Sequence, residues 1–380
     1  MSRWELYIHI PFCRQKCLYC DFASWAGRDD LMSAYVNAVK HDIETRAASL
    51  RREDGPAATI YIGGGTPTAL PRDLLLTLVQ SAIDTAGMPG EFTVEVNPGT
   101  ADEETLRQLR QCGVNRLSFG VQSFNNRLLR VIGRIHTAEE AEKAIRMAEK
   151  SGFSNVSLDL MYGLPGQNLD DLKSSVNRAL SLPVTHISIY GLQVEEGTPF
   201  YRMYEEGKLA LPDDDVTEAM YDYMTEELPR RGFRRYEISN FARPGFESRH
   251  NLGYWQDVPY LGVGAAAHSY LDGKRTENRR DPADYIRAVE AGEPVCFSEE
   301  ESSRDIAMEE FAFLALRTAS GIDESRFTTK FGCSIDAVYG DVIAPLVRDG
   351  LLRRENGHIA LTRYGAKYGN LIFEKFIRSV

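Results

Sequence analysis

The chain has 380 residues, of which 43% are hydrophobic and 26% are charged, and its formal net charge at pH 7 is −11. This composition excludes a disordered or low-complexity chain and predicts a globular protein with one large and one smaller domain. The acidic balance argues against a nucleic-acid partner bound over a large surface, and no stretch is long and apolar enough to predict an integral membrane protein.

The start of the chain and its cysteines indicate a compartment. Glu5 and His9 interrupt the apolar core that a secretion signal requires, so we expect a cytoplasmic protein. In that reducing compartment the six cysteines are expected to be metal ligands, catalytic groups or buried apolar residues rather than disulfides. Cys112, Cys296 and Cys333 stand alone and are expected to be structural.

Short runs rich in β-branched and aromatic residues predict six strands, with helical patterns between them. The runs lie at residues 4–10, 58–62, 91–96, 116–121, 155–161 and 186–190. Strands that alternate with helices favour a parallel sheet, and six such units are enough for a partial (β/α)6 TIM-type barrel. A doubly wound open sheet is the alternative that this pattern leaves open.

The helical patterns carry start and stop signals. Helices are expected at about 30–52, 71–87, 100–113, 137–152 and 168–180, and a later one over about 213–228. Thr100 with Glu103, and Thr137 with Glu140, have the spacing of capping boxes. Pro229 is expected to stop the last of these helices.

Polar residues and glycines follow the predicted strands at the point where each strand ends. Examples are "GGGTP" at 63–67, Asn97-Pro98, Gln122-Ser123, "YGLP" at 162–165 and Tyr190-Gly191. The carboxyl ends of parallel strands meet at one edge of the sheet, and this is where α/β folds place their sites. We therefore expect a single site at that edge.

The last part of the chain has a different organisation. Residues 291–305 have the Gly, Pro and acidic composition of a linker, which separates a domain of residues 1–290 from one of residues 306–380. After helical stretches, "LLRRENGHIALT" at 351–362 places a Glu-Asn-Gly turn between two apolar runs, as in a hairpin. Helices followed by a hairpin predict a small winged-helix-like α+β domain, with packing or partner docking as its expected role.

Three cysteines gather in the loop that follows the first predicted strand. Cys13, Cys17 and Cys20 have the spacing C-x3-C-x2-C, and thiolates select soft metals and iron–sulfur clusters. A structural zinc site needs a fourth ligand, and His9, within the strand, is poorly placed to supply it. A cubane cluster held by three thiolates instead leaves one iron open to a further ligand. Zinc and unrelated core cysteines are the alternatives.

This cysteine motif, with Tyr19 just before its last cysteine, resembles the radical SAM superfamily, and "GGGTP" looks like the methionine-binding segment of that superfamily. The resemblance continues through "EVNP", "FGVQSF", "IGRIH", "DLMYGLP", "GTPFY" and "HNLGYW", over about residues 4–300. It identifies the coproporphyrinogen III oxidase-like branch, and within it the radical SAM haem chaperones, the HemW family.

The resemblance implies a [4Fe-4S] cluster on Cys13, Cys17 and Cys20, with S-adenosyl-L-methionine at the open iron. The residues that it implies around S-adenosylmethionine are Tyr7, Tyr19, Gly64, Gly65, Thr66, Glu95, Gln122, Arg134 and Asp159. Their chemistry agrees, because Arg134 can pair with a carboxylate, and Glu95 or Asp159 can accept from an ammonium group or ribose hydroxyls. As alternatives, Glu95 and Asp159 could be strand carboxylates whose hydrogen bonds are satisfied within the protein, and Arg134 could form a surface ion pair.

Two functions are compatible with this branch. One is a haem chaperone, which binds haem and transfers it to acceptor haemoproteins. The other is a radical SAM enzyme that decarboxylates a porphyrinogen, as the oxygen-independent coproporphyrinogen III oxidases do. Phe22 stands where those oxidases typically carry a further cysteine, and the chain reaches Tyr7 without their N-terminal extension. These departures favour the chaperone and make the oxidase activity doubtful.

The motif "HNLGYW", at 250–255, matches the H-N-x-x-Y-W motif of the chaperone family. The resemblance implies that His250 ligates haem iron, with Tyr254 and Trp255 against the porphyrin. Other candidates are His136 and His268 for the iron, and Arg230, Arg231, Arg234 and Arg235 for the propionates. The family further implies delivery to respiratory haemoproteins at the membrane and a homodimer.

Overall fold

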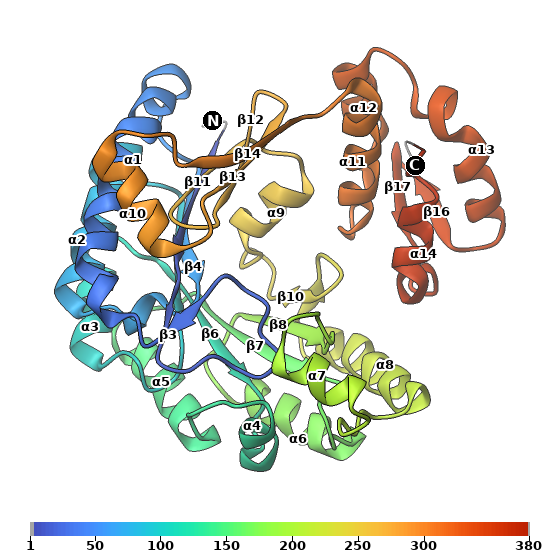
Figure 1. The fold of residues 1–380 in the computed structure, drawn as a ribbon. Coiled ribbons are helices and arrows are strands. Elements are labelled where there is room, and N and C mark those ends of the chain that lie inside the picture. The colour runs from blue at the N-terminus through green and yellow to red at the C-terminus, as the bar shows by residue number, and fades with distance from the viewer. Residues whose placement is uncertain (1–3, 379–380) are drawn as a thin grey trace.

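The computed structural model describes residues 4–378, and within them the main body is one twelve-stranded sheet, with helices along its outer side (Figure 1). Its strand order is β14-β13-β12-β11-β1-β4-β5-β6-β7-β8-β10-β9. The central strands from β11 to β8 run parallel to one another. They are β11 (Tyr260–Val263), β1 (Glu5–Ile10), β4 (Thr59–Gly64), β5 (Glu91–Val96), β6 (Arg116–Gln122), β7 (Val156–Tyr162) and β8 (His186–Gly191). The predicted partial barrel is confirmed.

Alternation along each strand separates the barrel interior from the helix layer. In β1, Leu6, Ile8 and Ile10 are fully buried in the main hydrophobic core. Glu5, Tyr7 and His9 alternate with them, so their side chains point to the other face, the barrel interior. The interior is therefore rich in polar groups, whereas the outer face of the sheet packs against helices.

Helices cover this outer face (Figure 1). Among them are α1 (Met32–Asp54), α2 (Arg72–Ala86), α3 (Glu103–Gln111), α5 (Ala138–Lys150) and α6 (Leu169–Leu180). The capping box of Thr137 and Glu140 at α5 is confirmed. The one expected at Thr100 is wrong, because Asp102 caps α3 by accepting from Thr105 N. No helix within residues 4–378 combines the length and the apolar character that crossing a bilayer requires.

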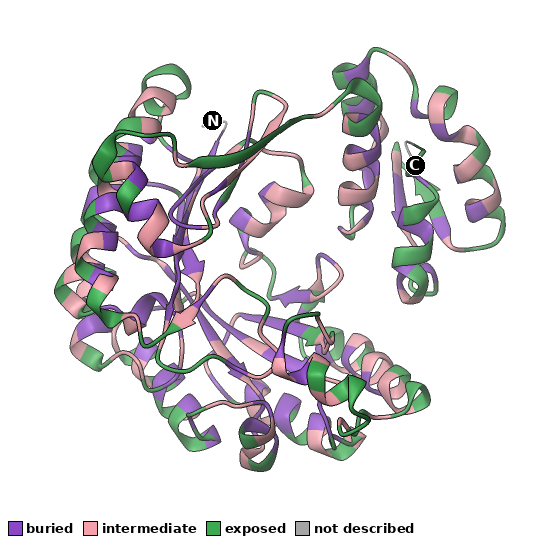
Figure 2. Ribbon diagram, in the orientation of Figure 1, coloured by how far each residue is buried: buried purple, intermediate pink, exposed green. Residues whose placement is uncertain are grey.

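Two further expectations are corrected at the ends of elements. Helix α8 (Asp214–Arg230) continues through Pro229, because a proline in the last turn removes only one helical hydrogen bond. The stretch with linker composition contains a strand, β14 (Cys296–Glu301), which pairs antiparallel with β13 (Lys274–Asn278). It is exposed along its length (Figure 2), so its acidic composition is that of an edge strand.

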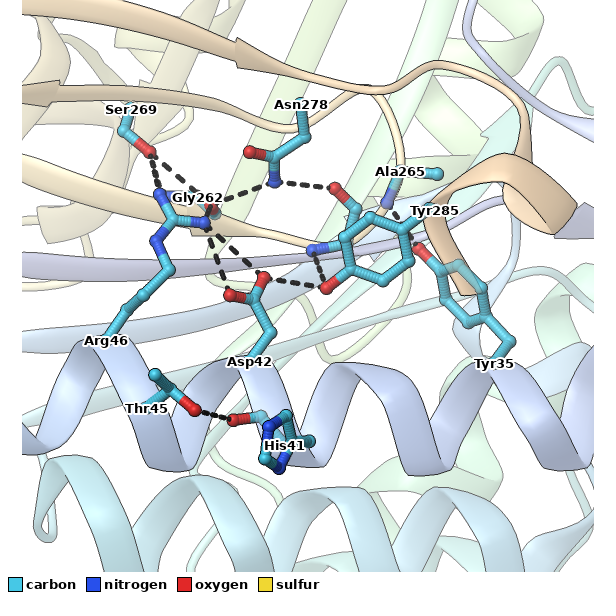
Figure 3. Close-up of polar contacts among 11 residues, drawn as sticks. Tyr35, His41, Asp42, Thr45, Arg46, Gly262, Ala265, Ser269, Asn278 and Tyr285 are labelled. Carbon is cyan, nitrogen blue, oxygen red and sulfur yellow. Dashed lines mark hydrogen bonds and ion pairs between the residues drawn. The ribbon is translucent and has the colours of Figure 1, made fainter. Parts of the chain in front are cut away.

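The sequence did not reveal the seventh parallel strand, β11, which has four residues. A buried polar network fastens it between α1 and α10 (Pro282–Ala291), as Figure 3 shows. The Tyr285 hydroxyl donates to Asp42 Oδ2 over 2.6 Å, and Arg46 donates to Asp42 and to the Gly262 carbonyl. The Tyr35 hydroxyl accepts from Ala265 N and donates to the His9 carbonyl, each over 2.8 Å. These bonds hold β11 against β1.

The C-terminal domain has its own hydrophobic core, separate from that of the barrel. Its elements are α11 (Arg304–Leu316), β15 (Ile322–Asp323), α12 (Glu324–Phe331), α13 (Ile335–Arg348), β16 (Leu352–Glu355), β17 (His358–Leu361) and α14 (Gly369–Glu374). The predicted hairpin is β16–β17, and Asn356 and Gly357 both have positive φ, as its tight turn requires. The winged-helix-like α+β domain is thus confirmed.

Candidate functional site

A cavity of about 1440 Å³ opens at the carboxyl ends of the barrel strands and extends to the C-terminal domain. This volume exceeds the roughly 300–1,000 Å³ of ordinary small-molecule sites. The predicted site residues that line it are Cys13, Cys17, Tyr19, Cys20, Gly64, Gly65, Thr66, Glu95, Gln122, Arg134 and Asp159. Tyr7 and His250 are not part of its lining. The fold thus brings eleven of the thirteen predicted residues to one cavity, as the positions after the strands predicted.

The cysteine loop is fastened at both ends. Its first strand, β2 (Phe12–Cys13), pairs with β3 (Trp25–Ala26), and Trp25 N donates to the Pro11 carbonyl over 2.7 Å. Inside the loop, Lys16 Nζ donates to the carbonyls of Phe22 and Ser24. These contacts fix the conformation of the loop, whose three cysteines line the cavity.

The three thiols differ in their surroundings. Thr66 Oγ1 donates to Cys13 Sγ, and Arg134 Nη1 donates to Cys17 Sγ, each over 3.6 Å. Burial raises the pKa of Cys13 and that of Cys20. In residues 4–378, no three His, Cys, Asp or Glu side chains gather closely enough to hold a single metal ion. The three thiols are therefore not gathered as the ligands of a lone zinc ion would be.

The glycine segment after β4 allows the chain to approach the cysteine loop closely. A Cβ atom on Gly64, whose φ is +110°, would lie 2.5 Å from the His9 ring. A Cβ atom on Gly65 would lie 2.8 Å from the Phe12 carbonyl oxygen and 3.1 Å from Cys13 Sγ. Any side chain here would displace the loop that carries the thiols. The glycines of the "GGGTP" segment are therefore needed for steric reasons, and they also leave the backbone accessible to a ligand.

Two carboxyl groups of the barrel interior face the cavity with raised pKa values. Burial raises the pKa of Glu95 to about 7, although the Tyr61 hydroxyl donates to Oε1 over 2.7 Å and Gly64 N donates to Oε2. Burial also raises the pKa of Asp159 to about 6, opposed by a hydrogen bond with Ser188. A cationic ligand would stabilise their ionised forms, which burial alone disfavours.

Arg134 and Gln122 lie beside these groups. Arg134 Nη2 donates to Asn97 Oδ1 over 2.8 Å and to the Gly120 carbonyl, while its buried Nε has no partner. Gln122 has φ +67°, a conformation that costs energy in a non-glycine residue, and the β6–β7 register shifts there. Strain of this kind is found where the surrounding structure fixes a side chain for a ligand.

Tyr7 lies behind the lining. Its hydroxyl shares a 2.9 Å hydrogen bond with His9 Nδ1, and His9 Nε2 shares one of 2.8 Å with the Ala23 carbonyl. Tyr7 thus contacts a histidine that supports the cysteine loop. A direct contact between Tyr7 and S-adenosylmethionine stays a prediction.

His250 belongs to α9 (Arg249–Trp255), a short helix at the amino-terminal end of the barrel interior. The residue is 1% exposed, and its ring stacks on Tyr61 with 5.0 Å between centroids. Nδ1 shares a 2.6 Å hydrogen bond with Thr59 Oγ1, and Nε2 shares one of 2.9 Å with the Tyr254 hydroxyl. Burial lowers its pKa to about 3. Neither ring nitrogen is free in this arrangement, so haem ligation by His250 stays a prediction that requires α9 to move.

The rest of "HNLGYW" has a visible structural role. A Cβ atom on Gly253 would lie 2.2 Å from Glu5 Oε1, so only glycine lets α9 approach β1 this closely. Asn251 and Trp255 line the cavity, and the buried Nε1 of Trp255 has no partner. The motif therefore docks α9 under the barrel and brings one face of it to the cavity.

The other predicted haem contacts lie elsewhere. His136 is buried and its Nε2 lies 3.2 Å from the Val121 carbonyl, while His268 is exposed on β12 (His268–Leu271). The arginines in question, Arg230, Arg231, Arg234 and Arg235, are not among the lining residues. Sequence reasoning missed two other arginines of the lining, Arg116 at the start of β6 and Arg317 of the C-terminal domain. An arginine that opens an otherwise apolar strand, "RLSFGV", was the available signal for Arg116.

Comparisons with known proteins agree with this geometry. Residues 7–179 match the radical SAM superfamily, and residues 303–366 match the HemN C-terminal domain. The structure resembles coproporphyrinogen III oxidase (HemN) from Escherichia coli, a radical SAM enzyme, with a TM-score of 0.86 over 100% of this chain and 91% of that one. Their sequence identity is 23%, so this similarity shows the fold alone.

Sequence relatives are closer. The chain is 40% identical to the protein named heme chaperone HemW of Bacillus subtilis, over 98% of both chains. It is 32% identical to heme chaperone HemW of Escherichia coli, again over 98% of both. Identity at this level over almost the whole length shows the family: the chain belongs to the HemW family of radical SAM proteins.

Proposed function

We propose that this protein binds haem and transfers it to acceptor haemoproteins. The observation that carries the proposal is its similarity, over 98% of its length, to proteins named haem chaperones. The cavity supports it, because about 1440 Å³ leaves room for a second large ligand beside S-adenosylmethionine.

In this proposal Cys13, Cys17 and Cys20 hold a [4Fe-4S] cluster, and S-adenosylmethionine occupies its open iron. A bound cluster of this kind can supply an electron to the ligand at that iron. Arg134 would pair with the methionine carboxylate, and Glu95 or Asp159 would accept from its ammonium group or from the ribose. These side chains are buried from bulk solvent and all line the same cavity, which supports the assignment.

The mouth of the cavity suits a large apolar ring. Exposed apolar or aromatic side chains line it from three parts of the chain: Phe22, Tyr190, Leu211, Tyr368 and Leu371. Phe22 comes from the cysteine loop, and Tyr368 and Leu371 come from the C-terminal domain. An exposed apolar patch around a cavity is a common mark of a ligand site, and a porphyrin has both a wide apolar face and a planar shape.

The second candidate function is oxidative decarboxylation of a porphyrinogen. The fold shared with HemN favours it, because the same cavity would accept such a substrate. Against it, the residue two positions after Cys20 is Phe22, whose side chain is 62% exposed at the cavity. The position where the oxidases typically have a cysteine therefore offers no thiol here, and this function ranks second.

The setting of the transfer is also proposed. The free cysteines of the described chain support a reducing cytoplasmic location. Respiratory haemoproteins at the membrane as acceptors, and a homodimer as the assembly, follow from the family resemblance. Size-exclusion chromatography with and without the cluster tests the homodimer.

The test uses protein whose cluster has been reconstituted without oxygen. Haem is titrated while the Soret absorbance is followed, and the loaded protein is mixed with an apo-haemoprotein whose own spectrum reports transfer. The same protein is incubated with coproporphyrinogen III, and loss of substrate and release of 5′-deoxyadenosine are measured. Saturable haem binding and transfer without porphyrinogen turnover are expected; porphyrinogen turnover without haem transfer would contradict the chaperone function.

Two histidine variants sharpen this test. His250→Ala removes the predicted iron ligand, and His41→Ala removes an exposed histidine of α1 as a matched control. If α9 moves to bring His250 to the iron, His250→Ala alone changes the Soret spectrum of the bound haem. An unchanged spectrum in both variants removes His250 as the ligand and leaves haem binding itself intact.

A further inference from the structure

The floor of the cavity carries a buried arginine without a charged partner. Arg116 is 1% exposed, yet it lines the cavity. Nη1 makes one long hydrogen bond, 3.5 Å, to Thr93 Oγ1, and the buried Nε has no partner. No ion pair of Arg116 is found within residues 4–378. A fully buried guanidinium is almost always paired, because its desolvation is otherwise uncompensated.

The carboxylates near Arg116 are engaged elsewhere. Glu91 accepts from the backbone N–H groups of Arg249 over 3.0 Å and His250 over 3.1 Å. Asp159 has a hydrogen bond with Ser188. Both act on Arg116 through their charge, which raises its pKa although burial opposes this. The guanidinium therefore stays charged and keeps donors that no side chain of the described chain uses.

Arg116 is also deep in the site. It is the first residue of β6 and Gln122 is the last, and both line the cavity. Six residues of extended chain span about 20 Å, so Arg116 lies far below the edge at which the cysteine loop sits. Arg134, beside Cys17, is the arginine near that loop. The two arginines are therefore placed for different anionic groups.

We propose that Arg116 binds a carboxylate of the haem in this cavity, one of its two propionates. This inference rests on the proposed function and adds the group that orients the haem. A guanidinium and a carboxylate match as a two-pronged, charge-assisted pair, and such pairs are strong where water is excluded. Other residues that line the same cavity also have a buried donor without a partner, among them Trp255 at Nε1 and Arg317 at Nε, and Arg317 lies 4.5 Å over the Trp255 ring. A ligand with two carboxylates thus finds donors for both.

The experiment compares two ligands that differ only in their carboxylates. Haem and haem dimethyl ester, in which both propionates are esterified, are titrated into cluster-reconstituted wild type and Arg116→Gln. The variant is expected to bind haem about ten- to a hundredfold more weakly, the worth of a hydrogen bond to a charged group, and to bind the ester as the wild type does. Arg116→Lys keeps the positive charge but lacks the two-pronged guanidinium, so its haem affinity is expected to fall less than that of Arg116→Gln.

Lys367→Gln is the matched control. Lys367 also lines the cavity, but its Nζ is already paired with Glu218 and Asp222, so its loss is expected to leave the preference for haem over the ester unchanged. S-adenosylmethionine affinity is measured in parallel, because its methionine carboxylate has the same chemistry as a propionate. Thermal melts of all variants verify that they fold.

The outcomes separate this inference from the proposed function. Equal haem affinity in wild type and Arg116→Gln overturns the role of Arg116 and leaves the chaperone function standing. Haem and ester affinities that fall together indicate a structural role, and a fall in S-adenosylmethionine affinity alone assigns Arg116 to that cofactor; either result overturns the proposal. Wild-type protein that binds no haem overturns both the function and the inference.

Discussion

Two buried polar regions lie on opposite faces of the same sheet and differ in how their groups are satisfied. On the outer face, Asp42 binds Tyr285 and Arg46, and the network closes on the backbone of β11 (Figure 3). On the inner face, Arg116 and Trp255 have side-chain nitrogens that no protein group binds. A satisfied network stabilises the fold, whereas unsatisfied donors at a cavity are expected to gain their partners from a ligand.

The outer network has one exception that helps to define the comparison. Asn278 Oδ1 is buried without a partner, although Asn278 Nδ2 donates to the carbonyls of Gly262 and Gly264. Asn278 does not line the cavity, so no ligand can reach it there. An unpartnered atom is therefore informative about function when its residue also lines a cavity, as Arg116 and Trp255 do.

The largest expected effect is on the outer network. Asp42→Ala removes the acceptor of the Tyr285 hydroxyl and one of the acceptors of the Arg46 guanidinium, and should lower the free energy of unfolding by about 3 kcal/mol. Arg46 is partly exposed, so water limits the loss. Urea denaturation measures it, with Glu44→Ala, exposed on the same helix, as the control. A loss no greater than that of the control would show that β11 is held by apolar packing instead.

The second effect concerns a buried acid at the amino-terminal end of the barrel. Burial, with the nearby Glu91, raises the pKa of Glu5 from 4.5 to about 9, and its Oε2 has no hydrogen-bond partner. Between these values the folded carboxyl keeps a proton that the unfolded one has lost, so stability falls as pH rises. Its contact with His250, at 3.6 Å, then joins two neutral groups.

Glu5→Gln copies the protonated form and removes this pH dependence. Relative to the variant, the free energy of unfolding of the wild type should fall by about 1.4 kcal/mol for each unit that the pH rises, or by roughly 2–3 kcal/mol between pH 6 and pH 8. Urea denaturation at both pH values gives the difference, and Glu44→Gln is the control. A difference between variant and wild type that does not change with pH would mean that Glu5 ionises normally in the fold.

Sequence reasoning succeeded where the signal is local. The six predicted strands agree with the structure within a few residues, because buried parallel strands are continuous apolar runs bounded by turns. The cysteine loop was found because three thiols within eight positions have few structural explanations. The thiols, the glycine segment and Glu95 come together because each follows or ends a strand of one parallel sheet.

Features that depend on distant residues were not visible. Strand β11 has only four residues, too few for a periodic signal, and its partners on α1 and α10 are far away in sequence. For His250 the motif gave the residue type, but not that Thr59 and Tyr254 occupy both ring nitrogens. Arg116 was correctly predicted to lie in a strand. That it is buried without a carboxylate partner depends on the folded structure and could not be predicted from the sequence.

A smaller effect concerns the cofactor end of the cavity. The pKa of Glu95 is about 7, so its ionised fraction rises across neutral pH. If Glu95 accepts from the ammonium group of S-adenosylmethionine, the affinity should rise roughly five- to tenfold from pH 6.0 to pH 7.5. Equilibrium binding to the cluster-reconstituted protein measures it. Glu95→Gln should bind more weakly with a flatter profile; an equally steep profile in the variant would assign the pH dependence to another group, such as Asp159.

The smallest expected effect concerns two tryptophans, one whose side-chain nitrogen is hydrogen-bonded and one whose side-chain nitrogen has no partner. Trp4 Nε1 donates to the Gly55 carbonyl over 2.9 Å, whereas the buried Trp255 Nε1 has no partner. Trp4→Phe removes a satisfied bond and should cost about 1–2 kcal/mol of stability without affecting haem. Trp255→Phe keeps a ring under Arg317 and removes only a donor that binds nothing in the free protein. Its stability should change by less than about 0.5 kcal/mol, while haem affinity falls about fivefold. If Trp255→Phe were as destabilising as Trp4→Phe and left haem affinity unchanged, a missing partner would mark a packing defect here and not a ligand contact.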